Sequence, residues 1–168
     1  ADFELGKASV LGDYVPSKLE MDEGENTIAM IVTKDYSGYV MFFFENGKVA
    51  KVDLSAYQTK TNRKKLIKAY CDKYPVAAIK HIKTDCELVM QSSAGRILLL
   101  NTGAISPKTT KDTQGVAVFT LKKGHTVSVV RDYVNGEFAK PYRYKTKTLP
   151  STGALLSAED AGEQMSLL

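Results

Sequence analysis

Two β-hairpins with the same pattern recur along this chain of 168 residues, and each is followed by a stretch rich in Lys, Arg and Thr. The first hairpin and its basic stretch occupy 38–66, and the second pair occupies 86–116. Their turn glycines, Gly47 and Gly95, lie 48 residues apart, and a basic residue follows each of them directly. A period of roughly 40–50 residues with several strands per unit is typical of propeller-like arrays of small sheets. The repeat therefore predicts an all-β chain whose basic loops recur at intervals around a rim.

Runs of β-branched and aromatic residues bounded by turn residues predict the remaining strands. Besides the strands on either side of Gly47 (38–45 and 48–54) and of Gly95, we expect strands at 1–12, 27–34, 75–83, 116–121, 125–134 and 137–148. Apolar and charged residues do not alternate cleanly in 48–54, which predicts a bulge or a change of face near Ala50. We expect an extended loop with a short turn in the long connection at 55–75, and two helical turns in RKKLIKAY are the alternative.

These elements predict about three four-stranded blades within 1–150, forming part of a larger domain. The expected units are 1–26 (partial), 27–74, 75–122 and 123–150. The remaining segment, 151–168, is acidic and rich in Gly, Ser and Ala, so we expect a flexible tail.

The apolar runs of the two hairpins require cover on both faces of each sheet. Successive side chains of a strand point to opposite faces, and Phe42, Phe43 and Phe44 stand in a row. The run Ile97–Leu100 likewise places apolar side chains on both faces of the second hairpin. Neighbouring blades stacked on both sides would supply that cover, with roughly 1.5–3 kcal/mol for each buried Phe or Leu. We therefore assign these aromatic residues to the core and not to a surface that stacks on bases.

The net charge is only +4, but the charges are unevenly distributed. Residues 46–147 hold 20 Lys and Arg against 7 Asp and Glu, whereas the two ends together hold 3 against 12. A basic body between acidic ends is typical of a protein that binds nucleic acid. The alternative is that Lys-rich loops keep a β protein soluble and protect its strand edges.

Catalysis and metal binding find little support in the sequence. Cys71, Cys86, His81 and His125 are the only thiol and imidazole side chains, and their spacing fits no metal motif. A Cys–His enzyme stays open only as a distant alternative. Two cysteines fit a reducing compartment, and no apolar run is long enough to cross a membrane. We expect no catalytic residue, cofactor or metal, and a cytoplasmic location.

The order of motifs resembles the C-terminal domain of the A subunits of bacterial type IIA topoisomerases, DNA gyrase and topoisomerase IV. The segments ENGKVAKVDLSAYQTKTNRKKLIKAY and SAGRILLLNTGAISPKTTKDTQGVAVFTLKKGHTVSVV carry the resemblance. Its sharpest part is Thr113–Val116 (TQGV), followed by Leu121, Gly124, His125 and Val127. The resemblance covers nearly the whole chain.

This resemblance implies a β-pinwheel, in which propeller-like blades exchange strands and a basic rim binds and bends duplex DNA. It implies three partners: duplex DNA, the breakage-reunion domain of the parent chain, and an ATPase B subunit. The strand-breaking tyrosine of such enzymes belongs to another domain, so none of the nine tyrosines here inherits that role. The gyrase-type Gly-rich basic box is missing from QTKTNRKKL (58–66), which favours the topoisomerase IV-like version.

Flexible cations at regular intervals suit contacts with the DNA backbone, which need no base readout. The residues expected to contact DNA are Lys60, Arg63, Lys64, Lys65, Lys68, Lys108, Lys111, Lys122, Lys123, Arg143 and Lys145. The main alternative is a propeller-type module that binds an acidic protein partner. The strength and salt dependence of duplex binding would distinguish this alternative from DNA binding.

Overall fold

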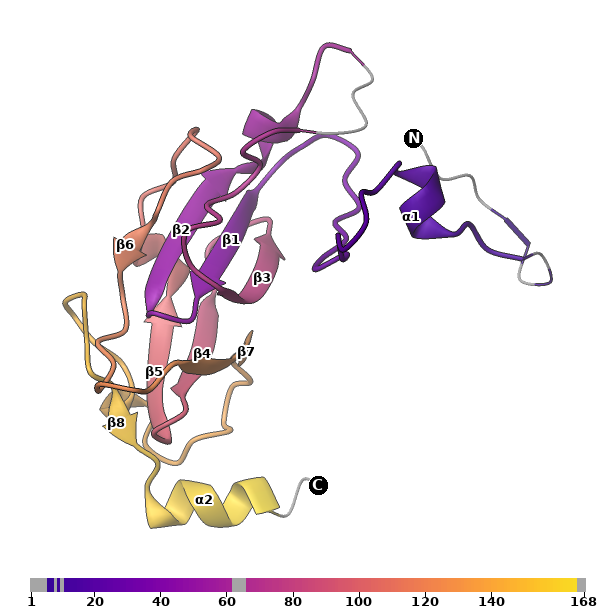
Figure 1. Ribbon diagram of the computed structural model, residues 1–168. Coiled ribbons are helices and arrows are strands. Elements are labelled where there is room, and N and C mark those ends of the chain that lie inside the picture. Colours follow the sequence, from indigo (N-terminus) through magenta and orange to yellow (C-terminus); the bar gives the residue numbers. More distant parts are fainter. Residues whose placement is uncertain (1–5, 8, 10, 62–65, 166–168) are drawn as a thin grey trace.

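The computed structural model describes residues 6, 7, 9, 11–61 and 66–165, and within them the chain is nearly all β (Figure 1). Its two α-helices are short, α1 at Val15–Lys18 and α2 at Ala158–Met165. Three 3-10 helices follow strands or loops, η1 at Leu54–Tyr57, η2 at Thr102–Ala104 and η3 at Pro141–Arg143. The all-β class expected from the sequence is confirmed.

The described strands form two antiparallel sheets of four strands each, with a predicted hairpin at the centre of each sheet. The first sheet has the order β3-β1-β2-β6, with β1 at Tyr39–Phe44, β2 at Lys48–Asp53, β3 at Val76–Ile82 and β6 at Val116–Ala117. The second has the order β7-β4-β5-β8, with β4 at Glu87–Ser92, β5 at Arg96–Asn101, β7 at Val127–Asp132 and β8 at Ala154–Leu155.

Each hairpin takes its outer strands from later parts of the chain. β3 and β6 flank the second hairpin in sequence, yet both pair with the first hairpin, β3 with β1 and β6 with β2. β7 and β8 likewise come from beyond the second hairpin and pair with β4 and β5. The strand expected at 75–83 therefore exists, but it lies in the first sheet instead of opening the second. Strands are exchanged between successive units.

The inner faces of the two sheets meet in one core. From the first sheet come Met41, Phe43 and Val49, all fully buried. The second sheet contributes Leu88, Met90, Leu98 and Leu100, and Val118 and Phe119 close the gap between them. The remaining residues of the Phe42–Phe44 run face the other way, so both faces of β1 are buried as the sequence required.

Several local expectations differ from the structure. The described part of 1–12 contains no strand, and 27–34 has no strand assignment because no described strand pairs with it. Residues 137–148 also form no strand, since Pro141 starts a 3-10 helix there. β6 from the expected second unit, β7 from the third and β8 from the C-terminal segment complete the two sheets. The described residues therefore form two four-stranded sheets where about three blades were expected.

Two further differences concern the return strand and the C-terminal segment. β1 and β2 pair in continuous register, and Val49 and Ala50 lie on opposite faces, so neither the bulge nor the change of face expected near Ala50 is present. The irregularities lie between Phe43 and Phe44 and between Gln91 and Ser92. The alternation looked broken because Lys51 points into the core side of β2, where only 3% of it is exposed. The segment 151–168, expected to be a flexible tail, carries β8 and α2.

Candidate nucleic-acid interface

Each hairpin is followed by the same capped turn, which starts the basic loop. The Asp53 carboxylate accepts a hydrogen bond from the Ser55 backbone N–H at 2.9 Å, at the start of η1. Asn101, 48 residues later, accepts one from the Gly103 N–H at 2.9 Å, at the start of η2. Such side-chain caps turn the chain sharply at the end of a strand. These equivalent turns lie directly before the basic segments that follow the two hairpins in sequence.

The loops at 106–115 and 144–153 lie along the same edge of their respective sheets. The Lys108 N–H donates to the Lys51 carbonyl at 2.8 Å, and the Asp53 N–H donates to the Lys108 carbonyl at 2.9 Å, beside β2. In the second sheet the Leu99 N–H donates to the Tyr144 carbonyl at 2.8 Å, beside β5. β6 and β8 then continue along these two edges, as Figure 1 shows.

A glycine with positive φ sets each of these two loops against its sheet. Gly115 has a φ of 71°, and a Cβ at this position would lie 2.4 Å from the Val49 carbonyl oxygen. Gly153 has a φ of 60°, and its Cβ would lie 2.5 Å from the Ile97 carbonyl oxygen. Val49 and Ile97 are equivalent positions of the repeat, so the two glycines have the same structural role. Only glycine combines this backbone conformation with such a close approach.

Most of the predicted DNA-binding residues that the structure describes are exposed to solvent. The exposed ones are Lys60, Lys68, Lys108, Lys122, Lys123, Arg143 and Lys145. Arg63, Lys64 and Lys65 lie outside the described residues. Lys111 is half-buried, and its ammonium group reaches the Ala56 carbonyl at 3.4 Å. The Lys145 ammonium group is 2.6 Å from the Glu87 carboxylate, although 47% of its side chain remains exposed.

The basic residues that follow the turn glycines, Lys48 and Arg96, make contacts within the fold. The Lys48 ammonium group lies 3.3 Å from the Tyr74 hydroxyl and 4.8 Å from the centre of its ring. The Arg96 guanidinium donates to the Gly153 carbonyl at 2.8 Å. These contacts attach neighbouring segments to the two hairpins, so regularity in sequence alone does not identify an interface residue.

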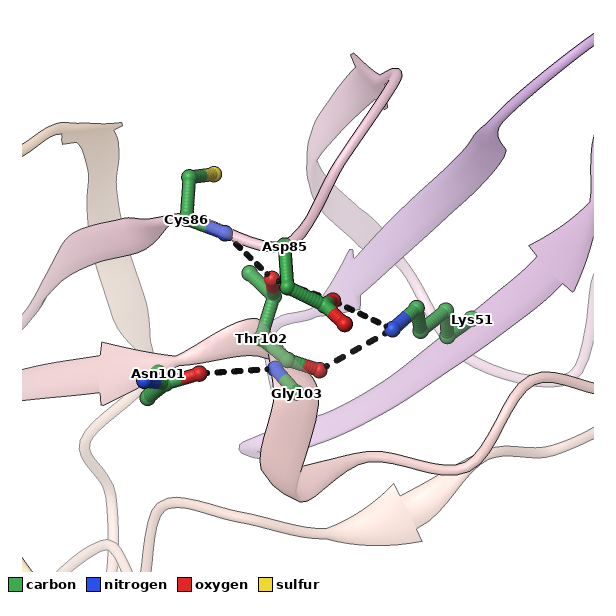
Figure 2. Close-up of polar contacts among 6 residues, drawn as sticks. All are labelled: Lys51, Asp85, Cys86, Asn101, Thr102 and Gly103. Atoms are coloured by element: carbon green, nitrogen blue, oxygen red, sulfur yellow. Dashed lines mark hydrogen bonds and ion pairs between the residues drawn. The ribbon is translucent and has the colours of Figure 1, made fainter.

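A buried lysine, which the sequence gave no reason to single out, joins the two sheets (Figure 2). The Lys51 ammonium group donates to the Asp85 carboxylate at 2.6 Å and to the Thr102 carbonyl at 3.2 Å. The Thr102 hydroxyl also donates to Asp85, at 2.8 Å, and accepts from the Cys86 N–H at 2.9 Å. The hydrogen bonds from Lys51 and Thr102 hold the pKa of Asp85 below its usual value. This network links β2 to the ends of β4 and β5, and so sets one basic edge relative to the other.

The surroundings of the cysteines do not favour the reactive thiol that a Cys–His enzyme would need. Cys71 is buried, and burial raises the pKa of the Cys86 thiol, which disfavours the reactive thiolate. His125 and Ser93 form a hydrogen bond of 3.0 Å at the surface. Within the described part of the chain, no three His, Cys, Asp or Glu side chains are grouped to hold a metal ion. A search of the same residues found no helix long and apolar enough to cross a membrane.

Two small sheets that exchange strands, with a basic loop docked on the same edge of each, define a propeller-like array of the pinwheel type. The chain is similar to the crystal structure of the C-terminal domain of DNA topoisomerase IV, with a TM-score of 0.64 and 21% sequence identity over 75% of this chain and 40% of that one. This chain thus corresponds to well under half the length of that solved domain. The β-pinwheel fold is confirmed, and with it, at the level of fold, the resemblance to type IIA topoisomerase A subunits.

Two further solved structures match less closely. A DNA gyrase A C-terminal domain gives a TM-score of 0.45 at 20% identity, over 58% of this chain and 32% of that one. The E. coli ParC C-terminal domain gives 0.46 at 16% identity, over 60% and 41%. No protein-family model matches the chain, and no curated protein matches its sequence.

Proposed function

We propose that this chain binds duplex DNA along the edge that carries its basic loops, as a non-catalytic C-terminal domain of a type IIA topoisomerase A subunit. The observation that carries the proposal is the repeated placement of one loop type on equivalent sheet edges. Lys108 is docked beside β2 and Lys145 beside β5, each held through the backbone. The loops are fixed through their backbone, while exposed side chains such as Lys108 suit contacts with a phosphate backbone.

The chemistry of the edge suits phosphates better than bases. Its charged groups are mainly lysines on exposed loops, which act as mobile point charges. Contacts of this kind carry no direct sequence information, so any site preference would come from the ease of bending the duplex. If about six phosphates are neutralised, affinity falls on the order of a thousandfold between roughly 50 and 200 mM salt.

The test is fluorescence anisotropy with a labelled duplex over a salt series. Replacing Lys60, Lys108 and Lys147 by Gln removes three exposed charges from the basic loops. The slope of log affinity against log salt is expected to fall by about two to three, roughly 0.9 for each phosphate contact. The control replaces Lys34, Lys73 and Lys83 by Gln, which removes the same charge from exposed sites outside these loops. Equal losses in the two triple variants would mean that DNA does not favour this edge.

The densest basic cluster provides a stronger variant. Replacing Arg63, Lys64 and Lys65 by Glu reverses three charges in the loop at 58–68. We expect duplex binding to be abolished while the melting temperature stays unchanged. Unaltered affinity would move the site elsewhere. If the unmodified chain binds no duplex, or binds it without salt dependence, the proposal fails in favour of a module that binds an acidic protein.

The parent protein follows from the same proposal. It would be an ATP-dependent topoisomerase in which this domain works with the breakage-reunion domain of the same polypeptide and with an ATPase B subunit. We favour the topoisomerase IV-like version because QTKTNRKKL at 58–66 lacks the glycine pair of the gyrase box. A cytoplasmic, nucleoid-associated location belongs to this proposal.

A further inference from the structure

Two tyrosines are the exposed aromatic residues of the part of the chain that the structure describes, Tyr14 at 72% and Tyr142 at 70%. A single exposed aromatic residue is ordinary on a protein surface. Tyr142 differs from such a residue because it lies in a basic loop, and because its side chain makes no hydrogen bond or ring contact with another described residue. Other tyrosines hold the fold, as Tyr74 does with Lys48 and Tyr144 with Asp160.

The turn that carries Tyr142 is fixed by its own backbone. Tyr142 is the middle residue of η3, which begins at Pro141. The proline ring sets the backbone angle of that first position. The Arg143 N–H donates to the Lys140 carbonyl at 3.1 Å, and the Tyr144 N–H donates to the Pro141 carbonyl at 3.1 Å. These bonds close the turn directly beneath the exposed ring.

Buried neighbours anchor this turn on both sides. Before it, Phe138 is 3% exposed, and the Ala139 N–H donates to the Asp160 carboxylate at 2.7 Å. After it, Tyr144 is 1% exposed, and its carbonyl accepts from the Leu99 N–H at 2.8 Å. The ring of Tyr142 is therefore presented to solvent on a backbone that is already ordered. An aromatic side chain held in this way loses little conformational freedom on binding a ligand.

Exposed cations surround the ring in sequence, and two of them have no ion-pair partner among the described residues. The Lys140 ammonium group pairs with Glu159 at 3.3 Å, and Lys145 pairs with Glu87 at 2.6 Å. Arg143, next to Tyr142, and Lys147, in the same loop, are the exposed cations without such a partner. Positive charge beside an ordered aromatic ring is the combination with which proteins hold single-stranded nucleic acid.

The ring and the cations address different parts of such a ligand. A base stacks on the face of an aromatic ring, while Lys and Arg contact the phosphates on either side. In a regular duplex the faces of the bases are covered by their neighbours, so a stacking ring needs a base that is unpaired. Tyrosine suits a partly wet site of this kind because its ring is apolar and its hydroxyl stays in water.

We propose that Tyr142 is a stacking site for an unpaired base of single-stranded DNA, with Arg143 and Lys147 as its phosphate contacts. The inference rests on the proposed function for the choice of DNA as the ligand, and extends it from duplex to unpaired strands. Stacking tolerates any sequence, because every base has a π-face. The site therefore adds a preference for unpaired bases without adding base readout.

The first experiment compares two labelled strands by fluorescence anisotropy. One is an oligothymidine of about 20 nucleotides, which spans a site of this kind. The other is an abasic strand of the same length, which keeps the phosphates and lacks the bases. Tyr142→Ala is expected to weaken oligothymidine binding on the order of ten- to a hundredfold, and abasic binding by less than about twofold. Tyr142→Phe keeps the ring and should keep the affinity.

Tyr14→Ala is the matched control for this variant. Tyr14 is exposed to the same degree, but it lies at the start of α1 beside Asp13 and outside the basic loops. It should leave binding of both strands unchanged. Neither variant should alter the melting temperature, because both side chains are exposed. Equal losses of Tyr142→Ala on the two strands would show that the ring does not meet a base, which would overturn the proposal.

A spectroscopic experiment detects stacking directly. The chain contains no tryptophan, so Tyr142→Trp places a single indole at the proposed site. Its fluorescence should be quenched when oligothymidine binds and should stay unchanged with the abasic strand. Tyr14→Trp provides the control and should respond to neither strand. A Tyr142→Trp signal that does not respond to oligothymidine under saturating conditions would overturn the proposal.

The duplex salt series, run in parallel, separates this inference from the proposed function. Salt-dependent duplex binding, together with oligothymidine binding that ignores the ring, would overturn the stacking site alone. Ring-dependent oligothymidine binding by a chain that binds no duplex would overturn the proposed function alone. The salt dependence of oligothymidine binding should be the same for Tyr142→Ala and the unmodified chain, because no charge is removed. An unmodified chain that binds no oligothymidine has no stacking site.

Discussion

The two outer faces of the sheet pair are completed in different ways, although both belong to the same repeat. Over the second sheet, Phe138 and Tyr144 pack on Val89, Ile97 and Leu99, and all five are buried. Over the first sheet, coil segments and half-buried tyrosines cover the apolar residues and leave a cavity.

Polar contacts reinforce the difference between the two faces. The Tyr144 hydroxyl donates to the buried Asp160 carboxylate, which also accepts from the Ala139 N–H at 2.7 Å and the Ser157 hydroxyl at 2.6 Å. This cluster fastens α2 to the segment that closes the second sheet. At the first sheet, the Tyr57 hydroxyl donates to the Ala69 carbonyl at 2.7 Å, which holds the half-buried Tyr57 and the connection over the apolar residues of the outer face. The comparison teaches that packed aromatic rings close the outer face of the second sheet, whereas coil segments cover the outer face of the first sheet loosely.

The largest effect on stability should come from removing an aromatic ring at the outer face of the second sheet. Phe138 is 3% exposed, and its ring centre lies 4.6 Å from that of Tyr144. Phe138→Ala is expected to reduce the free energy of unfolding by about 3–5 kcal/mol, because it leaves a cavity in a packed cluster. Ile31→Ala at the first sheet should cost about 1 kcal/mol, because Ile31 is only half-buried beside an existing cavity. Urea unfolding of both variants measures the difference, and similar losses would contradict it.

The next effect concerns the glycines that place the basic loops. Gly115 and Gly95 have the same φ of 71°, but a Cβ at Gly95 would meet nothing within 4 Å. Gly95→Ala should therefore cost about 1 kcal/mol for the backbone conformation alone. Gly115→Ala adds a clash with the Val49 carbonyl, and we expect about 2–4 kcal/mol in total. Urea unfolding of the two alanine variants separates the clash from the conformational cost, and equal losses would mean that the loop at 106–115 is not tightly docked.

Local features of the sequence predicted the hairpins and their turns correctly. Asn46-Gly47 and Ser93-Ala94-Gly95 set the turns through neighbouring residues alone, and the apolar runs beside them required two buried faces. Local features could not predict which sheet β3 joins, because its pairing with β1 depends on a hairpin some 35 residues earlier. The same limit explains 27–34, whose pattern is that of a strand but which pairs with no strand among the described residues.

The candidate interface was predictable only in part. A count of charges finds the basic loops, and most of their described lysines are exposed as expected. It does not show that Lys111 reaches the Ala56 carbonyl, that Lys145 pairs with Glu87, or that Lys51 is buried at the joint between the sheets. Those outcomes depend on which segments meet after the strands have been exchanged. Charge in the sequence marks the candidate loops, whereas packing decides which of their described cations make contacts within the fold.

The smallest effect is the pH dependence of stability that Asp160 contributes at the outer face of the second sheet. Burial raises the pKa of Asp160, but hydrogen bonds from Ser157, Tyr144 and the Ala139 N–H outweigh it and bring the pKa below its ordinary value of 3.8. A carboxyl group with a lowered pKa stabilises the fold above about pH 4, and this contribution is lost as the pH falls through the lowered value. Asp160→Asn should therefore cost about 1–3 kcal/mol at pH 7, and its melting temperature should approach that of the unmodified chain near pH 3. Glu159→Gln, beside it on α2, removes an exposed pair with Lys140 and should change stability by less than about 0.5 kcal/mol. If the gap between Asp160→Asn and the unmodified chain stays constant from pH 7 to pH 3, then the ionised carboxylate does not hold α2, and another contact must close the second sheet.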